Sequence, residues 1–176
     1  MRLVGALIDK ILRRANRRVL DFSAAEEEPA LPPPDSRQYY LLYLHIPYCR
    51  VLCPFCSFHR VRFSRDRTGQ YFESLRREIR FVTEAGYVFD ELYVGGGTPT
   101  VIPGDLAQTI QTVRELHPLQ AVSVETNPDD LEKGGIRRLG DVGVNRVSVG
   151  VQSFDDALLA EMQRLEPYGS GAVIAR

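Results

Sequence analysis

Residues 40–56 read Tyr40-Leu-Leu-Tyr43-Leu-His45-Ile-Pro47-Tyr-Cys49-Arg-Val-Leu-Cys53-Pro-Phe55-Cys56 and contain every cysteine of the chain. An apolar run that is typical of a buried strand leads directly into the cysteine spacing C-x3-C-x2-C. Soft thiolate ligands select iron–sulfur clusters, zinc or copper. A four-iron cluster held by only three cysteines keeps one iron open for chemistry. The stretch therefore predicts a strand that ends in a reactive metal centre.

His59, three residues after the last cysteine, supports a second interpretation. Three cysteines and one histidine form a common structural zinc site, so the cysteine run alone leaves zinc open. A structural zinc site needs neither a glycine run nor the carboxyl edge of a sheet, and both are predicted here. These surroundings favour a cluster that is bound by Cys49, Cys53 and Cys56.

Four apolar segments predict the strands of one sheet: Tyr40–Ile46, Glu91–Val94, Ala121–Glu125 and Arg146–Val151. Their apolar runs are nearly continuous, as is typical of parallel strands that are covered on both faces. Helical patterns separate the strands, and repeated strand–helix units predict an α/β fold with parallel strands and right-handed crossovers.

The expected helices differ in the strength of their signals. The patterns predict one helix over about Arg67–Glu84 with Gly86 as its stop, a second that groups Leu106, Ile110 and Val113, a third over Asp129–Leu139 that Gly134 and Gly135 weaken, and a fourth from about Asp155 with Leu158, Leu159 and Met162.

Unusual motifs follow each predicted strand, where parallel sheets bind their ligands. The glycine run Gly95–Gly97 lets backbone approach a ligand, and Glu125 offers acceptors to ribose hydroxyls or an ammonium group. Gln152 offers a donor and an acceptor, and Phe55 offers a flat face to a base. Each has a plainer explanation alone: a tight turn, a solvent-facing polar group or a core aromatic.

Composition and charge set the broad class of the protein. The 176 residues are 44% hydrophobic, with a net charge of −1 that gives no general attraction to nucleic acid. No stretch reaches the roughly 18 apolar residues that a membrane span needs. Three cysteines in one motif predict no disulfide framework and favour a reducing, cytoplasmic setting.

Three regions are expected along the chain. Residues 1–22 predict a basic amphipathic helix that either caps the domain or meets a membrane surface or partner. Residues 23–38 predict an acidic and proline-rich linker, and residues 39–176 the core domain.

Three segments together resemble the radical S-adenosylmethionine (SAM) superfamily: Tyr43–Cys56, Gly95–Thr100 and Gly150–Phe154. Within it, His45-Ile-Pro47 and Gly150-Val-Gln-Ser-Phe154 are similar to the oxygen-independent coproporphyrinogen III oxidase family, which includes heme chaperones. The resemblance implies a partial (β/α) barrel with about four of six strand–helix units. It also implies a radical oxidoreductase. In the oxidases, reductive cleavage of SAM gives a 5′-deoxyadenosyl radical, and a porphyrinogen propionate loses carbon dioxide during porphyrin biosynthesis.

The resemblance also implies roles for individual residues. Cys49, Cys53 and Cys56 would hold a [4Fe–4S] cluster, and SAM would bind the open iron. Tyr43, Gly96 and Glu125 match positions that contact this SAM, and Phe55, Gly97, Thr98, Gln152 and Arg164 match positions near a second SAM molecule. No catalytic side chain is assigned. The implied partners are a tetrapyrrole and a reduced flavodoxin- or ferredoxin-type electron donor.

The chain departs from the family pattern in two ways. Phe58 stands where the oxidases often have a fourth cysteine, as in the heme-chaperone branch. Strands five and six of the barrel and the C-terminal domain have no counterpart, which predicts a truncated protein or a second chain that supplies them. The last predicted strand would then present an apolar edge. Three functions stay open: a decarboxylating enzyme, a heme-binding or heme-delivery protein, and an inactive remnant.

Five arginines surround the cysteine loop: Arg50, Arg60, Arg62, Arg65 and Arg67. Arginine suits planar carboxylates, so these side chains either pair with tetrapyrrole propionates or are solvated loop charges. His45 and His117 are expected to be structural.

Overall fold

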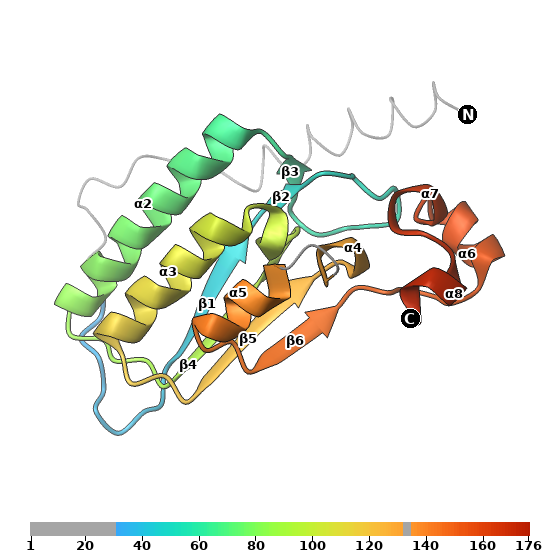
Figure 1. Ribbon diagram of the computed structural model, residues 1–176. Helices are drawn as coiled ribbons and strands as arrows, with labels where there is room; N and C mark the ends of the chain where they lie inside the picture. Colours follow the sequence, from blue (N-terminus) through green and yellow to red (C-terminus); the bar gives the residue numbers. More distant parts are fainter. Residues whose placement is uncertain (1–30, 132–134) are drawn as a thin grey trace. The chain divides into compact units, whose positions relative to one another are not determined.

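The computed structural model describes residues 31–131 and 135–176 (Figure 1). The chain divides into two units, Met1–Pro32 and Pro33–Arg176, and the fold below is that of the second unit. The helix predicted over residues 1–22 and the first part of the predicted linker lie outside the described residues.

A parallel sheet of four strands forms the centre of this unit, in the order β1-β4-β5-β6. Its strands are β1 (Leu41–Ile46), β4 (Glu91–Gly96), β5 (Ala121–Thr126) and β6 (Arg146–Val149). All four predicted strands are confirmed, with ends that shift by at most two residues. Their carboxyl ends meet at one edge of the sheet, and the sequence motifs follow at that edge.

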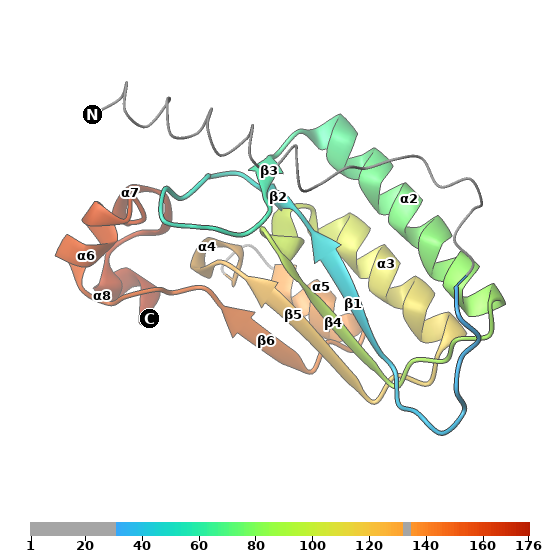
Figure 2. The same cartoon turned by 180° about the vertical axis from the view of Figure 1, so that it is seen from behind.

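Three helices cover one face of the sheet (Figures 1 and 2). They are α2 (Arg65–Glu84), α3 (Pro103–Leu116) and α5 (Gly135–Asp141). Buried side chains at helical spacing, such as Phe72 and Ile110, pack against Val94 and Val124 of the strands. Complete burial of one such side chain contributes about 1.5–3 kcal/mol. This layer holds the strands and therefore fixes the positions of their carboxyl ends.

The expectation that both faces of the strands are covered is wrong within the part of the chain that is described. Side chains alternate along each strand: Val94 and Val124 are buried under the helices, whereas Tyr43 on the opposite face is 50% exposed. Figure 2 shows that opposite face without described helices. The tyrosines and Leu41 lengthened the apolar runs in the sequence, although their side chains lie on the uncovered face.

The sheet edge at β6 was also expected to be apolar. β6 does lie at the edge, but its exposed side chains are those of Arg146 and Ser148, while Val147 and Val149 are partly buried. Alternation therefore gives a mixed edge, and the charge of Arg146 protects it from pairing with other strands.

The helix predictions hold for the long helices and fail in detail for the short ones. Gly86, at φ +93°, ends the helical region after α2 as predicted. The helix expected over residues 129–139 is two helices, α4 (Pro128–Leu131) and α5, with residues 132–134 between them not described. The fourth expected helix is only α6 (Asp156–Glu161), and α7 (Leu165–Tyr168) and α8 (Gly171–Ile174) follow it.

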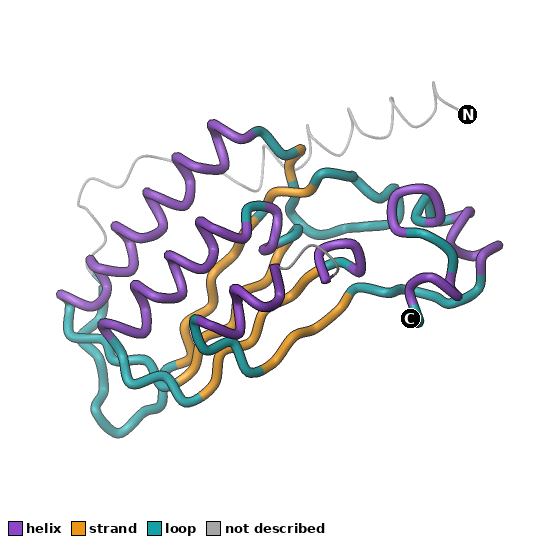
Figure 3. Tube along the Cα trace, in the orientation of Figure 1, coloured by secondary structure: helices purple, strands orange, loops and turns teal. Residues whose placement is uncertain are grey.

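These last three helices lie beyond the carboxyl ends of the strands, beside the cysteine loop (Figures 1 and 3). A short parallel pair, β2 (Tyr48–Cys49) and β3 (Val61–Arg62), joins the two ends of that loop. A 3-10 turn, η1 (Pro99–Val101), follows the glycine run. Among the residues that the structure describes, no helix has the length and apolar character needed to cross a membrane.

Candidate functional site

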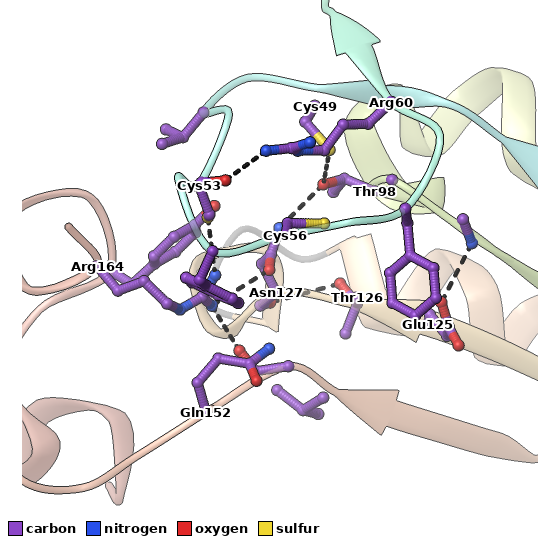
Figure 4. A pocket seen from close by; sticks show the side chains of 18 of the residues that line it. Cys49, Cys53, Cys56, Arg60, Thr98, Glu125, Thr126, Asn127, Gln152 and Arg164 are labelled. Carbon is purple, nitrogen blue, oxygen red and sulfur yellow. Dashed lines mark hydrogen bonds between the residues drawn. The ribbon is translucent and has the colours of Figure 1, made fainter. Parts of the chain in front are cut away.

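A cavity of about 380 Å³ lies where the strands end (Figure 4). Its wall combines the cysteine loop, the glycine run, the ends of β5 and β6, and two side chains of the C-terminal helices. The lining includes every predicted site residue except Tyr43: Cys49, Cys53, Phe55, Cys56, Gly96, Gly97, Thr98, Glu125, Gln152 and Arg164. Segments up to 119 residues apart in sequence therefore share one cavity, since Cys49 and Tyr168 both line it.

The cysteine loop is closed by backbone hydrogen bonds. The amide of Val61 donates to the carbonyl of Pro47 at 2.8 Å, and the amide of Phe63 donates to that of Cys49 at 2.9 Å. Cys49 and Cys53 are buried and Cys56 is partly exposed, with all three thiols free of disulfide bonds. The loop thus presents three unpaired thiols to the same cavity.

Thiols are soft ligands that can bind an iron–sulfur cluster or a single zinc ion. Among the described residues, no three His, Cys, Asp or Glu side chains are close enough together to hold one metal ion. In a [4Fe–4S] cluster each thiolate binds a different iron, so the sulfurs lie farther apart than the ligands of one zinc ion. His59 does not line the cavity, and its carbonyl oxygen lies 3.2 Å from Nε2 of His45. Three free thiols are thus a donor set that an iron–sulfur cluster can use.

Two side chains donate hydrogen bonds to the thiol sulfurs. The Thr98 hydroxyl donates to Sγ of Cys49 at 3.5 Å, and Nη1 of Arg164 donates to Sγ of Cys53 at 3.4 Å. Burial raises the pKa of the Cys49 thiol, whereas the Thr98 hydrogen bond acts in the opposite direction. Hydrogen bonds to the sulfur of a metal ligand orient that ligand and tune the centre that it binds.

The glycine run passes directly against the first cysteine. The amide of Gly97 donates to the carbonyl of Ile46 at 2.8 Å, and the amide of Thr98 donates to that of Tyr48 at 2.9 Å. Gly96 has φ +118°, a backbone conformation that residues other than glycine rarely adopt. The glycines therefore let the chain after β4 lie in contact with the chain after β1.

Glu125 is held in place at the end of β5. Its Oε1 accepts a hydrogen bond from the Tyr93 hydroxyl at 2.6 Å, and its Oε2 accepts one from the Gly96 amide at 3.2 Å. The bond to the Glu125 carboxylate is the main cause that raises the pKa of Tyr93. The sequence patterns did not single out Tyr93. The sequence feature that could have identified Tyr93 is its position two residues before Gly95, which places both residues on the same face of β4.

Tyr43 lies outside the cavity but belongs to the same face of the sheet. Its ring centroid is 6.0 Å from that of Tyr93, and its hydroxyl lies 3.0 Å from Nδ1 of His45. Burial, and then the charge of Glu125, raises the pKa of Tyr43. His45 is thus held by Tyr43 and by the His59 carbonyl, as a structural residue would be.

The far side of the cavity is built around a buried guanidinium. Arg164 is 3% exposed and donates to the Gly150 carbonyl at 2.5 Å and to Oδ1 of Asn127 at 3.4 Å. Its guanidinium carbon lies 4.0 Å from the centroid of the Tyr168 ring. Burial raises the pKa of Tyr168 to about 12, so its phenol is neutral at physiological pH. Asn127 and Tyr168 are lining residues that sequence reasoning did not assign.

Two of the five arginines around the cysteine loop, for which propionate pairing and solvation were both left open, bind to the protein itself. Arg50 pairs with Asp130 at 3.2 Å and donates to the Val101 carbonyl at 2.7 Å, and Arg60 donates to the Cys53 carbonyl. These two side chains hold the cysteine loop. His117 is buried beside Thr83, as the structural expectation required.

The chain is similar in sequence to known proteins. Residues 43–168, more than half of the chain, match the family model of the Radical SAM superfamily. The chain is 37% identical over 134 residues to the anaerobilin synthase of Escherichia coli O157:H7. This alignment covers 70% of this chain and 30% of the relative. It is 37% identical over 127 residues to the heme chaperone HemW of Lactococcus lactis, with 69% of this chain and 33% of the relative covered.

A solved structure gives the same result in three dimensions. Coproporphyrinogen III oxidase (HemN) from Escherichia coli superposes with a TM-score of 0.63 at 30% sequence identity, over 70% of this chain and 30% of that chain. The chain thus spans about a third of the length of these relatives. With its strands, its cysteine loop and most of its length matched, the chain belongs to the radical SAM superfamily.

Proposed function

We propose that the chain holds a [4Fe–4S] cluster through Cys49, Cys53 and Cys56, binds SAM at the open iron, and acts on a tetrapyrrole. Members of the radical SAM superfamily generally use this cluster and this cofactor. When both are bound, they supply a 5′-deoxyadenosyl radical that takes hydrogen from a substrate. The observation that carries the proposal is the cavity itself, which three thiols, the glycine run and Glu125 line together.

The side chains around the cavity would position SAM. Glu125 is already oriented by Tyr93 and the Gly96 amide, so its free lone pairs can accept hydrogen bonds from ribose hydroxyls or from the methionyl ammonium group. Phe55 lines the cavity with a ring that is 46% exposed and offers a flat face to the adenine. Phe55, together with Gly97, Thr98, Gln152 and Arg164, would contact a second SAM molecule in this proposal.

The names of the relatives support a tetrapyrrole as the substrate class. They include an anaerobilin synthase, heme chaperones and oxygen-independent coproporphyrinogen III oxidases. The finer proposal is oxidative decarboxylation of porphyrinogen propionates, with a reduced flavodoxin- or ferredoxin-type protein as the electron donor. A reducing cytoplasm would keep the three thiols available for the cluster.

Phe58 favours a second candidate function. Its ring is 72% exposed and lines the cavity at the position where the oxidases often have a fourth cysteine. An exposed apolar ring at a cavity mouth suits contact with a flat ligand such as heme. The second candidate is therefore a heme-binding protein that keeps the cluster but does not decarboxylate.

One set of anaerobic assays distinguishes these functions. The full chain, reconstituted with iron and sulfide and reduced with dithionite, is incubated with SAM in the presence and absence of coproporphyrinogen III. Formation of 5′-deoxyadenosine together with loss of substrate carboxylate supports the decarboxylase. A heme difference spectrum without decarboxylation supports the second candidate, and the absence of both outcomes contradicts the proposal.

A further inference from the structure

A turn in the chain directs Arg164 into the protein. Helix α6 ends at Glu161 with Met162 as its C-cap, and Gln163 adopts the left-handed conformation at φ +56°. The amide of Arg164 then donates to the carbonyl of Leu159 at 2.7 Å, the reversal that typically follows a helix end. Leu159 is completely buried, so the turn is fixed to the core and the direction of Arg164 is fixed with it.

The guanidinium connects four segments that are distant in sequence. Its Nη1 donates to Sγ of Cys53, which lies 111 residues earlier in the chain. Its Nη2 donates to Gly150 after β6 and to Asn127 after β5, and its face lies on the ring of Tyr168 in α7. A charged group buried to this degree is stable only when such partners compensate for its lost hydration.

Two arginine side chains donate hydrogen bonds to Cys53. Arg60, within the loop, donates to the Cys53 carbonyl, whereas Arg164, from outside the loop, donates to the Cys53 sulfur. Arg164 is thus the contact by which the C-terminal helices reach a thiol of the loop. A planar guanidinium can serve these separate acceptors at once, which a lysine ammonium on its single flexible stem cannot.

We infer that Arg164 is a positioning residue for Cys53, which holds the cysteine loop against the ends of β5 and β6 and makes cluster retention depend on the α6–α7 turn. The inference rests on the proposed cluster. It differs from the role that the family resemblance implies for Arg164, which is contact with a second SAM molecule. A positioning residue acts before any SAM is present, whereas a residue that only contacts SAM does not.

The test therefore omits SAM. Arg164→Gln, Arg164→Lys and wild type are reconstituted as full chains, and the rate of iron loss to a chelator is followed by absorbance. Loss of a partner that orients a metal ligand weakens metal binding by about 10- to 100-fold, so Arg164→Gln should lose iron at least about tenfold faster. Arg164→Lys keeps the charge but cannot donate to all three acceptors, so its rate of iron loss should lie between those of wild type and Arg164→Gln. Arg77→Gln is the matched control, because Arg77 is exposed and donates to Ser74 on the same helix, far from the cysteines in sequence.

A second measurement, hydrogen exchange, reports on the mobility of the cysteine loop in the protein without a cluster. Hydrogen exchange should increase in residues 49–60 of Arg164→Gln while the amides of β1, β4 and β5 stay protected. If Arg164→Gln does not fold, Tyr168→Leu, which removes the ring under the guanidinium, replaces it with the same expected direction. Wild-type iron retention and wild-type loop exchange in these variants overturn the inference. Failure of wild type itself to hold a cluster instead overturns the proposed function.

Discussion

A β-carbon added to Gly97 would lie 2.8 Å from the sulfur of Cys49, and 2.9 Å from the carbonyl oxygen of Pro47. Real β-carbons essentially never approach other atoms this closely, so a side chain at Gly97 requires the first cysteine or the backbone before it to move. The glycine run therefore has a structural purpose at the metal site, in addition to any contact with SAM.

Gly97→Ala tests this relationship. The added methyl group should displace Cys49, and the reconstituted variant should bind clearly less iron and sulfide per chain than wild type. The matched control is Gly69→Ala in α2, where an added β-carbon meets nothing within 4 Å. That control should keep its iron and gain about 1 kcal/mol in the free energy of unfolding, because alanine favours helix over glycine. A full iron complement in Gly97→Ala would contradict the close approach.

Tyr93→Phe removes the hydroxyl that orients Glu125. Since one hydrogen bond contributes about 0.5–1.5 kcal/mol, SAM binding to the reconstituted variant should weaken by about threefold to tenfold. Isothermal titration calorimetry measures this change. Tyr40→Phe is the control, because the Tyr40 hydroxyl accepts only from the Asp35 amide, before the start of β1. Equal SAM affinity in Tyr93→Phe and wild type would show that Glu125 needs no such support.

His117 should make stability depend on pH. Burial lowers its pKa below the usual 6.5, so the folded protein favours the neutral ring. The unfolded chain binds a proton more readily, and stability that is present above pH 6.5 is lost as the pH falls toward the folded-state pKa. In thermal unfolding between pH 7.5 and 5.5, His117→Gln should lose less stability than wild type. A loss of stability in His117→Gln equal to that of wild type over this pH range would contradict the role of His117.

Gln163→Gly should stabilise the turn that directs Arg164. The left-handed conformation costs a residue with a β-carbon about 1 kcal/mol, and glycine avoids this cost. Urea denaturation should therefore show an increase of about that size in the free energy of unfolding. Gln70→Gly, in the exposed part of α2, should instead lower it by about 1 kcal/mol. The same sign of change at both positions would contradict the assigned turn geometry.

Most of the fold could be predicted from local sequence patterns. The cysteine spacing, the glycine run and Glu125 each follow an apolar strand, and parallel pairing alone brings such residues to one edge of the sheet. Among the described residues one face of the sheet carries no helix, and this was missed because the tyrosines of β1 and β4 count as apolar in a periodicity pattern.

The contacts between motifs could not be predicted in this way. The bond between Tyr93 and Glu125 depends on the register of β4 and β5, which no single segment encodes. The bond between Arg164 and Cys53 crosses 111 residues and depends on a turn that Gln163 forms against the usual glycine preference. Short helices such as α4 and α7 have too few residues for a periodic signal.

The cluster assignment itself can be tested at the ligands. Cys53→Ser should lose most of its brown colour and its broad visible absorption after reconstitution, because a hydroxyl is a poor ligand for iron in a thiolate site. His59→Ala should keep both, since the His59 ring does not line the cavity. Loss of the metal in His59→Ala together with its retention in Cys53→Ser would instead indicate a zinc site.

The most direct measurement is electron paramagnetic resonance of the reduced, reconstituted full chain with and without SAM. We expect a [4Fe–4S] signal that changes when SAM is added, because SAM then binds to the iron that has no cysteine ligand. A signal that does not respond to SAM would contradict SAM binding at this cluster. A protein that retains zinc and shows no cluster signal would contradict the account as a whole.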